Sequence, residues 1–196
     1  MPLPPPPKRY TVAEYLALEE KSLEKHEFHD GEIVAMAGED PDHALITNNV
    51  GGSLIAALRG GPCRAYSADL RISIKSQRRI AYADNSVICG PLESDPDIGR
   101  PLAALNPRIV AEVLSRSTRG YDLGEKFQLY LNIPTFDTYV LIEQEEPYVQ
   151  VRSRQPNGDW LISFARGMDA VARLPSLGLS IPLTEIYAGV TFTPTA

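Results

Sequence analysis

The chain has 196 residues, of which 43% are apolar and 22% are charged, and its formal net charge is −6. This length suits one domain with a substantial core and is short for two. No apolar run of about 18 residues occurs, so the sequence predicts no transmembrane helix and no membrane partner. The acidic balance argues against a module that coats nucleic acid non-specifically, because such binding depends on phosphate neutralisation and counterion release.

The first nine residues are rich in proline and lack the apolar segment of a secretory signal. We expect residues 1–9 to form an extended, poorly ordered tail and residues 10–190 to form a single domain. The two cysteines, Cys63 and Cys89, lie in apolar contexts and form no paired-cysteine zinc pattern. We therefore expect buried free thiols in a reducing cytoplasm, with a disulfide between them as the less favoured alternative.

The first half of the chain predicts two helices and several strands. Thr11-Val12-Ala13-Glu14 is a capping box that opens a helix to about Glu20, and Asp30-Gly31 marks a hairpin turn. Apolar residues recur every four positions in a second helix from His43 to about Arg59. Strands are predicted over residues 63–67, 70–75 and 80–89, and strict alternation predicts that the second of them has one solvent-exposed face.

The second half predicts a polar surface loop, then a strand, a helix and further strands. The loop covers residues 91–107, the helix 118–131, and the strands 108–114, 137–143, 147–153, 159–165 and a weak one before Pro182. Strands 108–114 and 137–143 with the intervening helix predict a right-handed parallel crossover. We therefore expect a mixed α/β (α+β) fold in which one mixed sheet is flanked by helices.

Two carboxylates interrupt apolar, β-branched runs. Asp84 leads into Val87-Ile88-Cys89, and Glu112 follows Ile109-Val110-Ala111. Acidic residues in such runs are paired, hydrogen-bonded or metal-bound. Alone, each could be a structural carboxylate that pairs with an arginine or a backbone amide. Together, on neighbouring strands before a basic helix, they predict a metal-dependent site that cleaves phosphodiesters.

Carboxylates and water are the ligands that Mg²⁺ or Mn²⁺ prefers, and the carbonyl of Val113 is a candidate further ligand. Lys126, about two turns into the next helix, could reach back to stabilise the transition state. An ion pair with Asp122, four residues earlier, is an equal alternative. Glu27 is a candidate third acidic ligand, although a solvated strand start is somewhat favoured.

Other polar residues allow weaker predictions. His43 could contact a phosphate, but capping of its own helix is the favoured role. His26 and His29 are three apart in an expected strand and so face opposite sides, which disfavours a zinc site. A local basic patch could hold DNA phosphates, with an ordinary solvated surface as the commoner alternative; its members are Lys75, Arg78, Arg79, Arg116 and Arg119.

Several segments in order resemble the Uma-two family of restriction endonucleases, within the PD-(D/E)xK nuclease superfamily, from about Tyr10 to Tyr187. The segments are Thr11–Leu16, His26–Glu32, His43 with Asn49, Ser67–Arg71, Tyr82–Asp84, Glu112–Thr118 and Tyr121–Tyr130. The resemblance implies a restriction-endonuclease-like fold, Mg²⁺ and a DNA substrate, with Asp84 and Glu112 as metal ligands. Ala83 replaces the usual proline, and Leu114 stands where the superfamily carries lysine.

The resulting hypothesis is a Mg²⁺-dependent DNA endonuclease in which Asp84 and Glu112 hold the metal and Lys126 stabilises charge. The departure at Leu114 keeps open a catalytically impaired binding or accessory protein. A metal-dependent phosphoesterase acting on RNA or nucleotides is a third alternative. A homodimer is expected because double-strand cutting benefits from two-fold symmetry.

Overall fold

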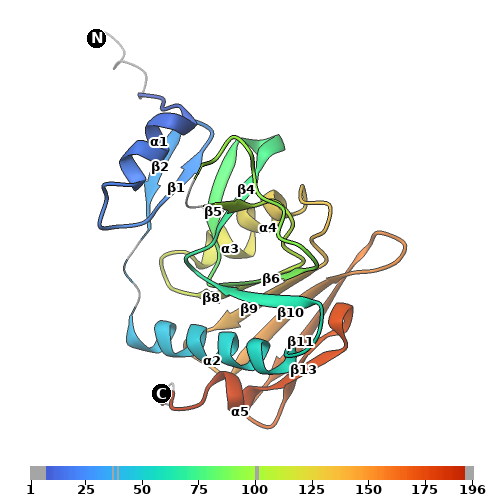
Figure 1. Cartoon of the computed structure of the whole chain (residues 1–196). Coiled ribbons are helices and arrows are strands. Elements are labelled where there is room, and N and C mark those ends of the chain that lie inside the picture. Colours follow the sequence, from blue (N-terminus) through green and yellow to red (C-terminus); the bar gives the residue numbers. More distant parts are fainter. Residues whose placement is uncertain (1–7, 37, 39, 100–101, 193–196) are drawn as a thin grey trace, which may run out of the picture.

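The computed structural model describes residues 8–36, 38, 40–99 and 102–192, arranged in three sheets with five α-helices among these residues. Most of the predicted proline-rich tail therefore lies outside the described residues. Figure 1 shows the five-stranded sheet above the six-stranded one, with α2 beneath. Within the described residues, no helix is both long and apolar enough to cross a membrane.

The five-stranded sheet carries the N-terminal elements in the order β2-β1-β5-β4-β7. The capping box of Thr11 and Glu14 is present at the start of α1 (Val12–Glu19), as predicted. The predicted hairpin is also confirmed, since positive φ angles at Asp30 (45°) and Gly31 (98°) turn β1 (His26–His29) into β2 (Glu32–Ala35). The other strands are β4 (Arg71–Ile74), β5 (Arg79–Tyr82) and β7 (Ala103–Ala104), and a short 3₁₀ helix, η1 (Lys75–Gln77), joins β4 to β5.

The six-stranded sheet has the order β11-β10-β9-β8-β6-β3. Its strands are β3 (Cys63–Ser67), β6 (Asn85–Cys89), β8 (Ile109–Leu114), β9 (Thr138–Glu143), β10 (Tyr148–Arg154) and β11 (Trp160–Arg166). Only the β8–β9 pair is parallel within this sheet of described strands, which confirms the predicted parallel crossover.

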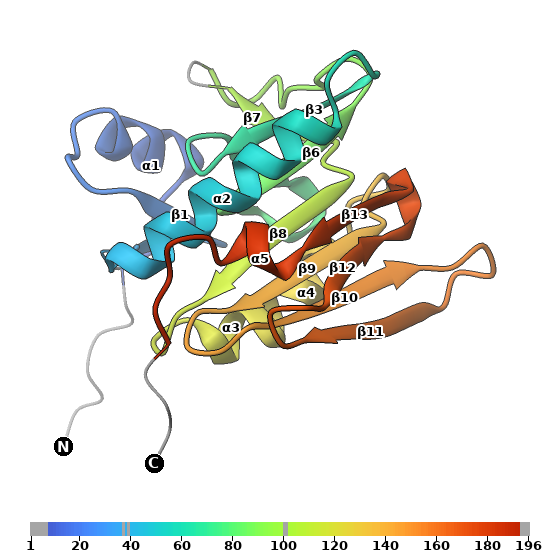
Figure 2. The same cartoon turned by 90° about the horizontal axis from the view of Figure 1, so that it is seen from below.

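Helix α2 (Pro41–Ala57) and the C-terminal elements cover one face of the six-stranded sheet (Figure 2). Those elements are β12 (Val171–Leu174), η2 (Pro175–Leu177), β13 (Leu179–Pro182) and α5 (Leu183–Ile186). The predicted four-residue repeat is the buried face of α2, where Ile46, Val50 and Leu54 enter the core. The opposite face of the sheet meets α4 and the five-stranded sheet in a second core.

Strand β8 serves both cores because its side chains alternate between its two faces. Ile109, Ala111 and Val113 enter the core beneath α2, whereas Val110 and Leu114 enter the core beneath α4. Glu112 is on the same face of the strand as Val110 and Leu114. The strand therefore directs one carboxylate into an apolar layer between the two large sheets.

Two predicted elements divide in the structure. The one expected mixed sheet is three sheets: residues 80–89 divide into β5 in one sheet and β6 in another, with Ala83-Asp84 between them, and β12 and β13 form a third. The expected helix 118–131 is α3 (Arg119–Leu123) and α4 (Glu125–Tyr130), separated at Gly124 (φ −116°, ψ −90°). Helix α2 also begins before His43, because Asp40 caps it and Pro41 suits its first turn.

The predicted exposed face of β4 was wrong, because all four of its residues are buried. Ser73 Oγ donates to Asp95 Oδ2 at 2.6 Å, and Arg71 Nε donates to the hydroxyl of Tyr82 at 2.7 Å. Asp95 belongs to the segment predicted as a polar surface loop, yet it is buried, and the same segment supplies β7 as the parallel neighbour of β4. The polar side chains of β4 are thus buried because each forms a hydrogen bond with a polar side chain of a neighbouring segment.

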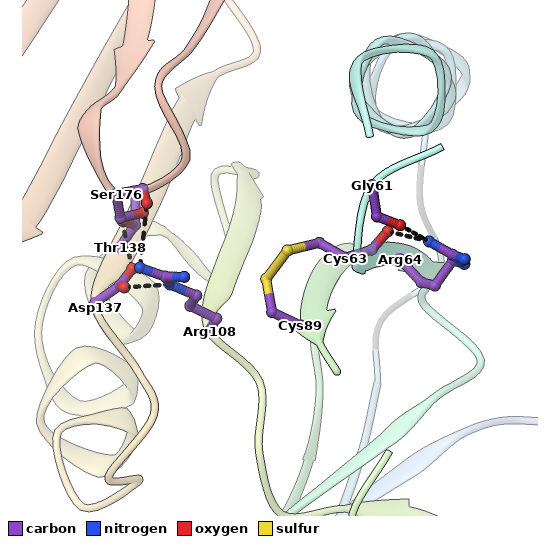
Figure 3. Close-up of a disulfide and its surroundings, with 8 residues drawn as sticks. All are labelled: Gly61, Cys63, Arg64, Cys89, Arg108, Asp137, Thr138 and Ser176. Atoms are coloured by element: carbon purple, nitrogen blue, oxygen red, sulfur yellow. Dashed lines mark hydrogen bonds and ion pairs between the residues drawn. A yellow bond between two sulfur atoms is a disulfide. The ribbon is translucent and has the colours of Figure 1, made fainter. Parts of the chain in front are cut away.

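The predicted free thiols were also wrong: Cys63 and Cys89 form a disulfide (Figure 3). The β3–β6 register pairs these residues directly across the antiparallel ladder. Sequence separation alone could not reveal this register. The inference of a reducing compartment from free thiols therefore loses its basis.

Reduction of the Cys63–Cys89 disulfide should lower the free energy of unfolding by about 2–4 kcal/mol, because it frees a long loop in the unfolded chain. Urea unfolding with and without reductant measures the difference. The double variant Cys63→Ala/Cys89→Ala is the control and should not respond to reductant. Two free thiols in protein purified without reductant would contradict the pairing.

Candidate active site

Asp84 and Glu112 are neighbours across the β6–β8 ladder. The antiparallel register pairs Asn85 with Ala111, so the next positions outward are Asp84 and Glu112. The backbone N–H of Asp84 donates to Glu112 Oε2 at 3.3 Å, and both side chains are buried. The structure thus brings together the two carboxylates on which the metal-site prediction rests.

Val113 and His43 complete the surroundings of Asp84. The backbone N–H of Val113 donates to Asp84 Oδ2 at 2.6 Å. The Nε2 of His43 lies 3.0 Å from the carbonyl oxygen of Val113 and 3.5 Å from Asp84 Oδ2. The prediction that His43 caps α2 was wrong, because Asp40 accepts the free N–H groups of that first turn and leaves the imidazole to reach the site.

Lys126 enters the same layer from α4, and its ammonium is enclosed by three carboxylates. Its Nζ lies 3.0 Å from Glu112 Oε1, 3.4 Å from Asp122 Oδ1 and 3.9 Å from Glu27 Oε1. Lys126 therefore both reaches back to Glu112 and pairs with Asp122, and its role in stabilising a transition state stays a prediction. The Asp122 pair, however, is buried rather than on the helix surface.

Glu27 reaches this cluster from β1 and is 6% exposed, so it is not a solvated strand start. One carboxylate oxygen accepts from the backbone N–H of Tyr82 at 3.2 Å. The other lies 2.7 Å from His29 Nε2 and accepts from the Tyr121 hydroxyl at 3.2 Å. With both oxygens engaged in this way, Glu27 holds Lys126 in place, and a role as metal ligand stays a prediction.

The cluster carries more negative than positive charge. Burial raises the pKa of Glu112 well above its usual range, and nearby Asp84 and Asp122 add to the rise although Lys126 opposes it. Burial alone would lower the pKa of Lys126, but Glu112, Glu27 and Asp122 raise it well above 10.5. The lysine therefore stays protonated, while the ionised form of Glu112 has too little positive charge around it to offset its burial.

The donor set at this point suits a hard divalent cation. Asp84 Oδ2 and the carbonyl oxygen of Val113 both lie within 3.5 Å of His43 Nε2, so these two oxygens are near each other. Within the described residues, no three or more His, Cys, Asp or Glu side chains form a metal-binding group by themselves. Mg²⁺ does not need such a group, because it binds through one or two carboxylates and keeps several waters.

A cavity of about 1140 Å³ opens onto these residues, and its lining includes Glu27, Asp84, Glu112, Val113 and Lys126. Among the predicted DNA-binding residues, Arg116 and Arg119 also line the cavity, as far as the described residues define it. Lys75, Arg78 and Arg79 lie instead around η1 and pair with Asp97, Asp30 and Glu125. The structure thus divides the predicted basic patch in two.

Sequence reasoning missed the contacts of His43, Tyr121 and His29 with the cluster. His43 contacts the carbonyl of Val113, 70 positions away in sequence, and no local sequence pattern predicts such a contact. The contact between Glu27 and His29 could have been predicted from the sequence, because alternate residues of a strand share a face. Asp122 was noticed only as the helical neighbour of Lys126.

Replacement of Lys126 by methionine should lower the free energy of unfolding by about 3–5 kcal/mol at neutral pH, because it leaves buried carboxylates without their cation. The loss should shrink as the pH falls, because Glu112, whose pKa is raised by burial, becomes protonated first and then no longer needs a cation. Urea unfolding at several pH values measures both effects.

Lys25→Met is the matched control, because it removes an ammonium whose side chain is 42% exposed and whose carboxylate partner, Asp69, is 83% exposed. It should cost no more than about 1 kcal/mol. Equal losses in the two variants would contradict the buried cluster.

Comparison with known proteins identifies the family. A family model described as "Uma2: Putative restriction endonuclease" matches residues 12–184. The uncharacterized protein slr1290 of Synechocystis sp. is 36% identical over 91% of this chain and 92% of its own length. A second Synechocystis protein, sll1609, is 35% identical over 83% of this chain and 91% of its own length.

A solved structure from Anabaena variabilis, titled as a putative nuclease belonging to DUF820, matches with a TM-score of 0.70 at 17% identity. The match covers 88% of this chain and 97% of that one, so the two share a fold. This confirms the expected α/β fold of restriction-endonuclease type. Since the family model spans most of the chain, the protein belongs to the Uma2 (Uma-two) family.

Proposed function

We propose that the protein is a divalent-metal-dependent endonuclease that hydrolyses phosphodiester bonds of DNA. The observation that carries this proposal is the convergence of Asp84, Glu112 and the ammonium of Lys126 at one wall of an open cavity. Membership of a family described as restriction endonucleases supports it. A cluster with equal numbers of acidic and basic groups could serve only to stabilise the fold. A buried cluster that has more carboxylates than cations and faces a cavity suits a reaction that needs a metal cation.

The residues that would hold Mg²⁺ or Mn²⁺ are Asp84, Glu112 and the carbonyl of Val113. A metal bound there supplies a water of lowered pKa and neutralises charge on the phosphate. Val113 N–H fixes Asp84 Oδ2, and His43 contacts both the Val113 carbonyl and Asp84. These contacts hold the oxygen ligands in place before substrate arrives.

Lys126 supplies a positive charge that does not depend on pH in the ordinary range, because its pKa is raised by the carboxylates around it. Its role is to stabilise the negative charge that develops on the phosphate oxygens. Glu27 and Asp122 position the ammonium at 3.9 Å and 3.4 Å. Leu114, which stands where the superfamily carries lysine, is buried in the core that contains Phe127 of the same helix as Lys126.

A second candidate, a non-catalytic binding or accessory protein, is favoured by the charge of the cavity. Its lining contains eight Asp or Glu residues and three Lys or Arg residues. A polyanion would bind such a surface poorly without a metal ion. A phosphoesterase on RNA or nucleotides would use the same groups, and a substrate panel separates it from a DNA nuclease. The homodimer and the cytoplasmic location stay predictions.

The purified protein should cut plasmid DNA in Mg²⁺ or Mn²⁺, and Asp84→Asn should slow cutting by about 100-fold or more, because a charged metal ligand is lost while its shape is kept. Asp97→Asn, which removes one charge from the exposed pair with Lys75, is the control and should cut normally. Cutting that survives Asp84→Asn would point to a contaminating nuclease and not to this site.

Calorimetric titration with Mn²⁺ separates the enzyme from the accessory protein. Binding should be present in the parent protein and weakened at least about 10-fold in Glu112→Gln, which keeps the size of the side chain but removes a ligand charge. Absence of Mn²⁺ binding in the parent protein would leave the non-catalytic candidate standing.

A further inference from the structure

The segment Ser115–Arg119 directly follows β8, begins three residues after Glu112 and ends at the first residue of α3. All five of its residues line the cavity. It offers two guanidinium groups and three hydroxyls, which are the side-chain groups that most often contact phosphates. Four residues of extended chain span at most about 14 Å, so Arg116 lies within a few nucleotides' reach of Glu112.

Both arginines of this segment form ion pairs with carboxylates that also line the cavity. Arg116 Nε lies 2.5 Å from Glu145 Oε1. Arg119 contacts both oxygens of Glu143, through Nη2 at 2.5 Å and Nε at 3.4 Å. Glu143 ends β9, and Glu145 lies in the turn that follows, so one hairpin neutralises both cations.

The two ion pairs differ in how easily a phosphate could open them. The side chains of Arg116 and Glu145 are 89% and 60% exposed, and a pair of this kind is worth about 0–1 kcal/mol. Glu143 is buried, and its backbone carbonyl accepts from the Tyr187 hydroxyl at 2.8 Å. Arg116 is therefore the cation that a ligand can recruit, whereas Arg119 is held by a fixed partner.

We propose that Ser115–Arg119 is the element that grips the phosphate backbone of DNA beside the reacting bond, and that Glu145 masks it in the free protein. This inference rests on the proposed function, because it assigns a substrate contact to the same cavity. When DNA enters, a phosphate displaces Glu145 from Arg116, and the exposed carboxylate turns to solvent. The ion pair with Glu145 lowers the affinity of Arg116 for other anions. Once DNA displaces Glu145, Arg116 provides the acidic cavity with a cation that binds the substrate.

The hairpin offers a matched control for this proposal. Glu146, next to Glu145, also forms an exposed ion pair, with Arg166 at 3.4 Å, but neither residue lines the cavity defined by the described residues. Glu145→Gln and Glu146→Gln remove the same charge from adjacent positions. Only the first releases an arginine that faces the cavity.

The experiment measures binding of a short fluorescent DNA duplex in EDTA and in Ca²⁺, so that neither Mg²⁺ nor Mn²⁺ is present. Glu145→Gln should tighten binding about two- to fivefold, which is the range expected when a surface ion pair no longer competes. Glu146→Gln should leave binding unchanged. Arg116→Ala should weaken binding and reduce the slope of log K against log salt by about 0.9, which corresponds to one lost phosphate contact.

The combined variant Arg116→Ala/Glu145→Gln tests whether the mask acts through Arg116. Its affinity should equal that of Arg116→Ala, because Glu145 then has no cation to cover. Equal tightening by Glu145→Gln and Glu146→Gln, or tightening by Glu145→Gln that persists without Arg116, would overturn the inference.

Failure of the inference and failure of the proposed function give different results. If plasmid cutting depends on Asp84 but Glu145→Gln does not tighten binding, the masked grip is wrong and the nuclease stands. If the parent and all variants bind no duplex and no Asp84-dependent cutting occurs, both are wrong.

Discussion

The buried ammonium of Lys126 is the constraint on which the rest of this structure depends. An ion removed from water costs several kcal/mol unless well-placed partners compensate it. Its partners come from three separate elements: Glu27 from β1, Glu112 from β8 and Asp122 from α3. One cation therefore ties the five-stranded sheet to the six-stranded sheet, and the packing of the two sheets assembles the candidate site at the same time.

The position of the lysine follows from the geometry of β8. Residues 112 and 114 share a face of this strand, so a lysine at position 114 would point toward the same layer as Glu112. Here Leu114 fills that position in the core, and Lys126 of α4 supplies the ammonium 3.0 Å from Glu112. Both routes place a positive charge beside the same carboxylate.

The sequence correctly predicted those features that depend on interactions between residues close together in the chain. The Thr11–Glu14 box, the Asp30-Gly31 turn and the apolar runs around Asp84 and Glu112 each depend on residues close in sequence. The failures share a different cause. The Cys63–Cys89 pairing depends on strand register, and the contact of His43 with Val113 depends on how α2 crosses β8. Such contacts are set by tertiary packing, which no short window of sequence contains.

The acidic net charge and a nucleic acid substrate are compatible because of where the cations are held. All five arginine and lysine residues predicted to contact DNA form ion pairs with carboxylates in the described structure. These five residues therefore present little uncompensated positive charge to a polyanion, and the cavity lining holds more acidic than basic residues. A divalent ion reduces that negative charge, and a phosphate can then compete for the exposed guanidinium of Arg116. By linkage, a cation bound at the proposed site and a phosphate bound at Arg116 would each strengthen the binding of the other.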